Sequence, residues 1–409
     1  MGYVARTIST TASLVAPTWW TGLADKTWAV ICNGSGSGFD GGARLRDALA
    51  SPTLPGGGNT ISITAYSTAA VDQSRAEVTI IGGGHSDYAG NEAIGLALRT
   101  SQPGWSRWCE PSPGAYATNS LVKGGIGQYD ADRGKNGWPA SSHTYHRLVY
   151  ANDRYWLPGL AGTFPSTAAT SRIFWCDRLT RRWCAGGYWI DDADLSKYGA
   201  TWMEEGGAVY VALDDAIYVE ATGHIGYGTE VRVAKIDART GAVLKRWTTS
   251  QMDGFCTGSV YSIPGTRYVV GRSHYGPGQL VVWNMATDPP ARTNITPGGP
   301  AAGAGWADDR YGGAWHIATG GLVLGLGGGE TFVKLVPNTP SAYTGAWTAT
   351  LVSPTNVGSP SRVIPPSDSN VYGRYTIVDD MGDGRSALVY QPSNTSSPTY
   401  VMALPAAGL

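Results

Sequence analysis

Residues 78–98 read VTIIGGGHSDYAGNEAIGLAL, and this stretch decides the fold that the sequence predicts. An apolar, β-prone run at 78–81 stops at three glycines, and a second apolar run begins at Ala93. Glycine suits the end of a strand because it permits a positive φ and a close backbone approach. A short segment with Trp105 and Trp108 follows. The stretch therefore predicts three antiparallel strands, which cannot bury both faces of their sheet alone.

This pattern recurs along the chain from about residue 60. We expect six units of about four strands each, separated by turn residues. The expected strands are 61–66, 78–81, 93–98 and 105–108; 147–150, 154–159, 172–175 and 182–184; 199–202, 208–212, 230–237 and 243–247; 258–261, 267–271, 279–283 and 293–295; 315–317, 321–327, 331–335 and 346–350; and 361–364, 374–378, 386–390 and 399–402. Such a repeat is typical of a β-propeller.

Closure into a ring covers both faces of every sheet and leaves only short edges exposed. The sequence therefore predicts an all-β propeller with six blades of four antiparallel strands, and seven blades are the alternative. The β-prone run 28–31 either joins the unit formed by the end of the chain or completes a seventh unit. We expect an N-terminal segment at 1–58, which closes the ring or attaches to a partner, and the propeller at 59–409.

Two features resemble the kelch-repeat group of propellers. They are the glycines that end second strands and the tryptophans of last strands, namely Gly82, Gly83, Gly84, Gly159, Gly271 and Gly327 with Trp108, Trp183, Trp247 and Trp347. The segment 82–91, followed by Ser142-His143-Thr144-Tyr145, is similar to kelch-like proteins of tailed bacteriophages and bacteria. The resemblance covers about residues 60–406, and the first two units match best.

Charge and hydropathy exclude several classes of partner. The 409 residues are 15% charged with a formal net charge of -1, which leaves no basic footprint for nucleic acid. No run approaches the roughly 18 apolar residues that span a bilayer, and the start of the chain lacks the apolar centre of a secretion signal. We therefore expect a protein without a signal peptide, membrane insertion or nucleic-acid binding, and the phage-like resemblance implies that it is made in the host cytoplasm and found in the virion.

The cysteines are odd in number and form no CxxC pair. They are Cys32, Cys109, Cys176, Cys184 and Cys256. This pattern favours buried thiols in a reducing compartment over a zinc site or a disulfide framework. A single disulfide between Cys176 and Cys184 across a hairpin is the alternative.

Polar residues in the kelch-like segments form the candidate ligand site. They are His85, Asp87, Tyr88, Asn91, Trp138, His143 and Tyr145. Together with His146 they could converge at one end of the ring as metal ligands or as an acid–base set. The structural interpretation, in which Asp87 and Asn91 bond turn backbone and His85 satisfies a buried carbonyl, is favoured. We therefore expect ligand contacts here, with no catalytic residue, metal or cofactor.

Other polar and aromatic groups also have two interpretations. The acidic runs 191–194 and 379–384 suggest calcium loops, but the spacing of an EF-hand is missing, and solvated turns are favoured. Aromatic residues could stack on sugar faces or pack between blades: Trp138, Tyr188, Trp189, Tyr227 and Tyr275.

These observations predict a binding or structural protein and not an enzyme. Neither the copper-ligand set of kelch-type oxidases nor the Asp-box of sialidases is evident, and a fold alone carries no activity. The phage-like resemblance implies a bacteriophage virion component of the tail, spike or fibre, oligomeric within a larger assembly. It would contact other virion proteins, a host-surface glycan or both. A bacterial carbohydrate-binding or scaffolding propeller is the alternative, and a kelch-type oxidase or glycan-active enzyme is the third possibility.

Overall fold

The computed structural model describes fifteen stretches of the chain. They are residues 15–36, 38–49, 67–81, 91–111, 139, 144–160, 170–190, 206–220, 231–252, 259–272, 279–306, 312–326, 331–355, 374–392 and 394–409.

The described residues form six antiparallel sheets of four strands, which confirms the predicted fold class and blade number. From the inside of each blade outward, the strands are β2 (Ala69–Asp72), β3 (Glu77–Ile81), β4 (Ala93–Ala97) and β5 (Trp105–Cys109); β6 (Val149–Ala151), β7 (Arg154–Leu160), β8 (Thr170–Asp177) and β9 (Arg182–Tyr188); β10 (Ala208–Val211), β11 (Ala216–Glu220), β12 (Val231–Asp237) and β13 (Val243–Thr248); β14 (Val260–Ser262), β15 (Tyr268–Arg272), β16 (Leu280–Asn284) and β17 (Ala291–Ile295); β18 (Gly313–His316), β19 (Gly321–Gly325), β20 (Phe332–Pro337) and β21 (Trp347–Val352); and β22 (Tyr375–Val378), β23 (Ser386–Tyr390), β24 (Thr399–Leu404) and β1 (Trp28–Ile31).

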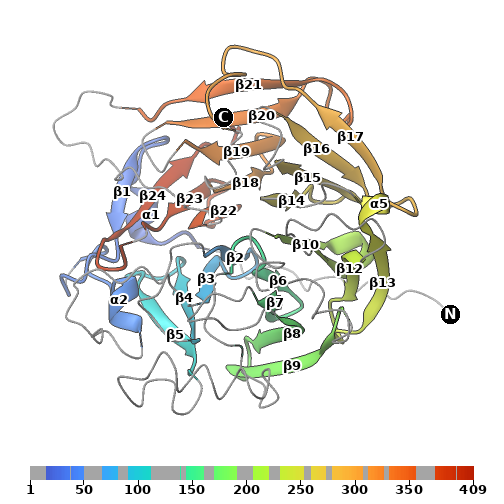
Figure 1. Cartoon of the computed structure of the whole chain (residues 1–409). Helices are drawn as coiled ribbons and strands as arrows, with labels where there is room; N and C mark the ends of the chain where they lie inside the picture. The colour runs from blue at the N-terminus through green and yellow to red at the C-terminus, as the bar shows by residue number, and fades with distance from the viewer. Residues whose placement is uncertain are drawn as a thin grey trace.

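The blades surround a common axis (Figure 1). Each innermost strand contacts the innermost strands of the two neighbouring blades, and β22 contacts β2, so the ring is closed. Radial packing covers both faces of each sheet, which a single blade could not do alone.

Strand β1 closes the ring as the outermost strand of the sixth blade. It pairs antiparallel with β24, and Trp28 lies opposite Met402. Of the two alternatives for residues 28–31, joining the last unit is therefore the one that the structure adopts. The first and last parts of the chain share one sheet, so hydrogen bonds hold the ring shut.

Helix α1 (Thr18–Thr21) reinforces this closure from the rim. Nε1 of Trp19 donates to the carbonyl of Thr100 in the first blade at 2.8 Å, and Nε1 of Trp20 donates to Oδ1 of Asp383 in the sixth at 3.0 Å. A second short helix, α2 (Leu45–Ala48), contacts β5. Helix α1 therefore ties the first and sixth blades together, and α2 packs on the first blade.

Three units differ from the predicted strand pattern. In the third blade the innermost strand is β10, which was expected as the second strand, and β11 was not predicted. In the sixth blade β22 is innermost and β1 fills the outermost place, whereas a first strand was expected at 361–364. The expected first strands 61–66, 199–202 and 361–364 lie outside the described residues.

Tryptophans near the outer strands fill the spaces between blades. Trp247 of β13 packs with Val260, Val269 and Trp283 of the fourth blade. In the first blade, Trp108 lies so close to Gly95 that a Cβ at that position would stand 2.1 Å from the indole ring. Glycine is therefore required at this strand position by contact with a neighbouring ring.

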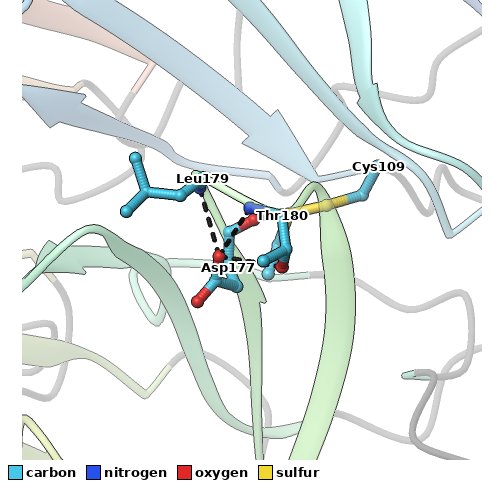
Figure 2. The surroundings of a disulfide bond; sticks show 5 residues. Cys109, Asp177, Leu179 and Thr180 are labelled. Carbon is cyan, nitrogen blue, oxygen red and sulfur yellow. Dashed lines mark hydrogen bonds between the residues drawn. A yellow bond between two sulfur atoms is a disulfide. The ribbon is translucent and has the colours of Figure 1, made fainter.

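A disulfide joins Cys109 of β5 to Cys176 of β8, across the first two blades (Figure 2). The favoured prediction of free buried thiols is therefore wrong for Cys109 and Cys176, and so is the alternative, a bond between Cys176 and Cys184. Cys184 lies opposite Trp175, and Cys176 lies opposite Trp183. Because successive strand residues point to opposite faces, Cys176 and Cys184 lie on opposite faces of their sheet. Cys32 and Cys184 are free thiols, whereas Cys256 lies outside the described residues.

Figure 2 also shows the turn that follows Cys176. Oδ1 of Asp177 accepts hydrogen bonds from the backbone N–H groups of Leu179 and Thr180 and from the Thr180 hydroxyl. Asp237 makes the same three bonds to Arg239 and Thr240 in the third blade. The turn between third and fourth strands is thus built on a repeated Asp-x-x-Thr segment.

No helix in the described stretches is long and apolar enough to cross a membrane.

Candidate functional site

The two ends of the ring are distinguished by the direction of the innermost strands. Strands β6 and β10 run the same way, because the backbone leading into β6 forms a parallel bridge with that leading into β10, at His146 and Gly207. The other blades repeat the same order of strands from the inside outward. We call the end at which the innermost strands begin the start end; Thr68 and His146 lie there. The opposite end, with Gln73 and Asp379, is the turn end.

A cavity of about 280 Å³ follows the ring axis and is lined by all six innermost strands. This volume is close to the lower limit of about 300 Å³ for small-molecule sites. Small residues, including Ala69, Ala208 and Gly313, keep the axis open. The cavity therefore has room for one small ligand.

The second-to-last residue of every innermost strand lines the cavity. These six residues, which we call the penultimate layer, are Val71, Tyr150, Tyr210, Tyr261, Trp315 and Ile377. Four of the six are aromatic, and they come from four consecutive blades. The layer thus brings four aromatic residues to the cavity, each with an apolar ring and a polar group at its edge.

Hydrogen bonds fix the tyrosines of the penultimate layer. The Tyr210 hydroxyl donates to Oδ1 of Asp215 at 3.0 Å, and the Tyr150 hydroxyl donates to Oδ1 of Asp153 at 3.2 Å. Burial and, after it, the adjacent carboxylates raise the pKa of both phenols well above its usual value. Both hydroxyls are therefore neutral donors across the physiological range.

Asp379 lies at the turn end of the cavity and its backbone is held on two sides. Its N–H donates to Oε1 of Gln73 at 2.9 Å, and Nε2 of Gln73 donates to the carbonyl of Ile377 at 2.9 Å. The Ser386 hydroxyl donates to the Asp379 carbonyl at 2.7 Å. These bonds fix the backbone of Asp379, from which the carboxyl group extends.

The carboxyl group of Asp379 has a raised pKa and one buried oxygen without a hydrogen-bond partner. Burial raises its pKa to about 6, against the lowering effect of a hydrogen bond from the backbone of Ile317. Among the residues that the structure describes, Oδ1 of Asp379 is buried and has no hydrogen-bond partner. A buried oxygen without a partner loses the hydrogen bonds it would make to water, so a ligand donor would be stabilising there.

Other acidic groups at the turn end tie neighbouring blades together. Asp214 of the third blade accepts from Nε of Arg267 in the fourth at 2.5 Å and from Nζ of Lys235 at 3.1 Å. Burial alone would raise the pKa of Asp214, but hydrogen bonds from Tyr218, Arg267 and Lys235 outweigh it and lower the pKa. These carboxylates are occupied by structural contacts, unlike Oδ1 of Asp379.

The structure describes two of the seven candidate ligand residues. Asn91 is buried, and its Nδ2 donates to the carbonyl of Pro139 at 2.6 Å. Tyr145 is buried with a φ of 44° and does not belong to the described lining of the cavity. His85, Asp87, Tyr88, Trp138 and His143 lie outside the described residues.

Contacts at the start end join the two kelch-like segments, 82–91 and 142–145, in which most of these candidate residues lie. Asn91 reaches Pro139, and the N–H of Thr68 donates to Oγ1 of Thr144 at 3.1 Å. His146, which follows Tyr145, lines the axial cavity. The residues leading into β4 and β6 therefore meet at the start end.

Buried charged residues at the start end were not predicted. Three arginines and two glutamates there are nearly inaccessible to solvent: Arg147, Arg272, Arg374, Glu92 and Glu220. Arg272 donates to Oγ of Ser259 at 2.7 Å and to the carbonyl of Trp306 at 2.9 Å. Buried charges need partners, so these residues hold strand ends in place. In the sequence, a charged residue at the end of an apolar run, such as Arg272 at the end of β15, could have indicated this cluster.

The other candidates were the aromatic residues considered for sugar stacking and the acidic runs considered for calcium binding. Of the two interpretations of Trp189, packing between blades is confirmed, because its side chain is fully buried in the core between the second and third blades. Tyr188 is half-buried, with the Arg172 guanidinium 5.8 Å from its ring centre. Residues 379–384 form a turn in which Asp380 Oδ1 accepts from the N–H of Gly382 at 2.7 Å. Trp138, Tyr227, Tyr275 and 191–194 lie outside the described residues.

Within the described ranges, no group of three His, Cys, Asp or Glu side chains is placed to hold a metal ion.

The chain is similar to known proteins in structure but not in sequence. No family model matches the chain, and no curated protein matches it. Among solved structures, an alpha-L-arabinanase of Penicillium chrysogenum complexed with arabinobiose is similar, with a TM-score of 0.47 and 10% identity. The likeness covers 85% of this chain and 95% of that one.

Proposed function

We propose that this propeller is a carbohydrate-binding protein whose ligand occupies the axial cavity. The observation that carries the proposal is the penultimate layer, in which Tyr150, Tyr210, Tyr261 and Trp315 line one cavity. Aromatic rings offer flat apolar faces to the C–H groups of a sugar, and polar groups nearby bond its hydroxyls. Gln73 and Asp379 supply polar groups at the turn end.

Binding without cleavage is part of the proposal. Hydrolysis of a glycosidic bond ordinarily uses two carboxyl groups that flank the bond. Within the described lining, Asp379 is the one residue with a carboxyl group. A turnover assay with any sugar that binds, followed by chromatography of the products, tests this part directly.

The biological setting that we propose is a bacteriophage virion. The kelch-like segment at 82–91 and the segment at 142–145 support it through their similarity to kelch-like phage proteins. There the propeller would bind other virion proteins and present its cavity to a host-surface glycan. Mass spectrometry of purified virions tests this setting, and a bacterial source without a prophage would favour the bacterial carbohydrate-binding alternative.

The cavity itself is tested with a glycan array and a blocked variant. Ser262 lines the cavity, so Ser262→Phe places a phenyl ring there, whereas Ala286→Phe adds the same group at an exposed turn. The proposal predicts glycan binding by the wild type and by Ala286→Phe, and its loss in Ser262→Phe. Equal binding by all three proteins, or a blank array with the wild type, contradicts it.

A further inference from the structure

We infer that the axial cavity selects sugars that carry a free, protonated amino group, with Asp379 as the group that recognises the amine. This inference rests on the proposed function and narrows its ligand class. Asp379 is the one residue of the described lining that has a carboxyl group, and one oxygen of that group, Oδ1, is buried without a hydrogen-bond partner. An ammonium group is a strong partner for it, because a hydrogen bond between two charged groups is about twice as strong as a neutral one.

The position of Asp379 favours recognition over a structural role for its carboxyl group. Its backbone is fixed by Gln73 and Ser386, which act on the main-chain N–H and C=O. In the described part of the chain no arginine or lysine forms an ion pair with it, although ion pairs occupy Asp72 and Asp214 at the same end. The side chain thus adds a negative charge to the cavity that the described ion pairs do not neutralise.

The rest of the described lining has no cationic group that would repel an amine. Apart from His146, its polar residues are uncharged at neutral pH: Thr68, Gln73, Tyr150, Tyr210, Tyr261, Ser262, Trp315 and Thr376. The aromatic members of this set also attract cations through their ring faces. Charge and ring composition therefore favour the same ligand, a sugar ring that bears one ammonium group.

Isothermal titration calorimetry at neutral pH with glucosamine, N-acetylglucosamine and glucose tests the inference. These probes differ at one ring position, which carries an ammonium, a neutral amide or a hydroxyl. The wild type is expected to bind glucosamine at least about tenfold more tightly than the other two, as one charge-assisted hydrogen bond provides. This comparison needs no variant.

Two variants then assign the preference to Asp379. Asp379→Asn keeps the shape of the side chain and its backbone bonds, so it should remove the preference for glucosamine over glucose and N-acetylglucosamine. Glu110→Gln is the matched control, since it removes one negative charge from a side chain that is 76% exposed after β5. It should bind all three sugars as the wild type does, and thermal unfolding of both variants shows that they are folded.

The failures of the inference and of the proposed function are distinguishable. Equal affinity of the wild type for the three sugars, or a glucosamine preference that survives in Asp379→Asn, overturns the amine inference while the carbohydrate site stands. If none of the three sugars binds and no glycan on the array binds, both the proposed function and the inference are overturned.

Discussion

Nε2 of His316 lies 3.0 Å from Oγ of Ser386, so a hydrogen bond links the last residue of β18 to the first residue of β23 in the next blade. The Ser386 hydroxyl donates its proton to the Asp379 carbonyl, so its oxygen must accept from Nε2. On the other side, Nδ1 lies 2.7 Å from Oγ1 of Thr319, which accepts the N–H of Leu409. In the neutral imidazole of His316, Nε2 therefore carries the proton and Nδ1 accepts from the Thr319 hydroxyl.

This state makes stability depend on pH. Burial lowers the pKa of His316 from 6.5 to about 4. Because the unfolded state binds this proton more readily, the contribution of His316 is complete above pH 6.5 and is lost as the pH falls toward 4. The loss between pH 7 and pH 4.5 is about 2 kcal/mol. Urea unfolding of the wild type and of His316→Gln, which can still donate to Ser386, measures it.

Both the wild type and His316→Gln must be measured, because the titration of Asp379 changes the free energy of unfolding in the direction opposite to that of His316. Its pKa is raised from 3.8 to about 6, so its effect increases stability as the pH falls through that range. Asp379 is present in both proteins and its effect cancels. Parallel loss of stability by the wild type and His316→Gln would show that His316 is not a buried neutral group.

Ring closure predicts a large effect at Trp20. Its side chain is fully buried, its Nε1 donates to Asp383, and the Arg385 guanidinium lies 5.1 Å from its ring centre. Trp20→Ala should lower the free energy of unfolding by about 3 to 5 kcal/mol, as other buried aromatic truncations do. Val15→Ala, at a side chain that is 81% exposed, should change it by less than about 0.5 kcal/mol. Similar unfolding midpoints for the two variants would argue against docking of α1 on the rim.

The disulfide is expected to protect two specific cysteines. Alkylation of the unfolded, non-reduced protein should label Cys32 and Cys184, whereas Cys109 and Cys176 should react only after reduction. The bond closes a loop of 67 residues, so its loss in Cys109→Ser is expected to reduce stability by up to about 4 kcal/mol. Cys184→Ser serves as the control. Labelling of Cys109 without reduction would contradict the assignment.

Two strand glycines provide a matched pair for core packing. A Cβ at Gly95 would stand 2.1 Å from the Trp108 ring, whereas a Cβ at Gly187 in β9 would meet no atom within 4 Å. Gly95→Ala should therefore reduce the free energy of unfolding by about 1 to 3 kcal/mol or more, and Gly187→Ala should have little effect. Chemical denaturation of both variants measures the difference, and equal stability would mean that Trp108 does not pack on Gly95.

Local patterns predicted most of the fold. The strand runs of the second, fourth and fifth units were located within a few residues, because each unit has short β-prone runs separated by turns. The third unit was misread because β10 and β11 are joined by only four residues, 212–215, and a run at 199–202 already filled the first place. In the sixth unit the fourth strand comes from the other end of the chain.

The site and the disulfide depend on contacts that local patterns do not reveal. Tyr150, Tyr210 and Tyr261 are visible as aromatic residues in short runs, but their shared place in the penultimate layer depends on where each strand ends. Cys109 and Cys176 are far apart in sequence and meet only because their blades are neighbours. Ring topology therefore determines both features.

A crystal structure of the protein soaked with the sugar that binds most tightly in solution would show directly whether the axial cavity is the binding site. We expect electron density for one sugar in the axial cavity, against Tyr210 and Trp315 and within hydrogen-bonding distance of Asp379. Sugar density on the outer strands of a blade, with an axial cavity that contains only water, would contradict it.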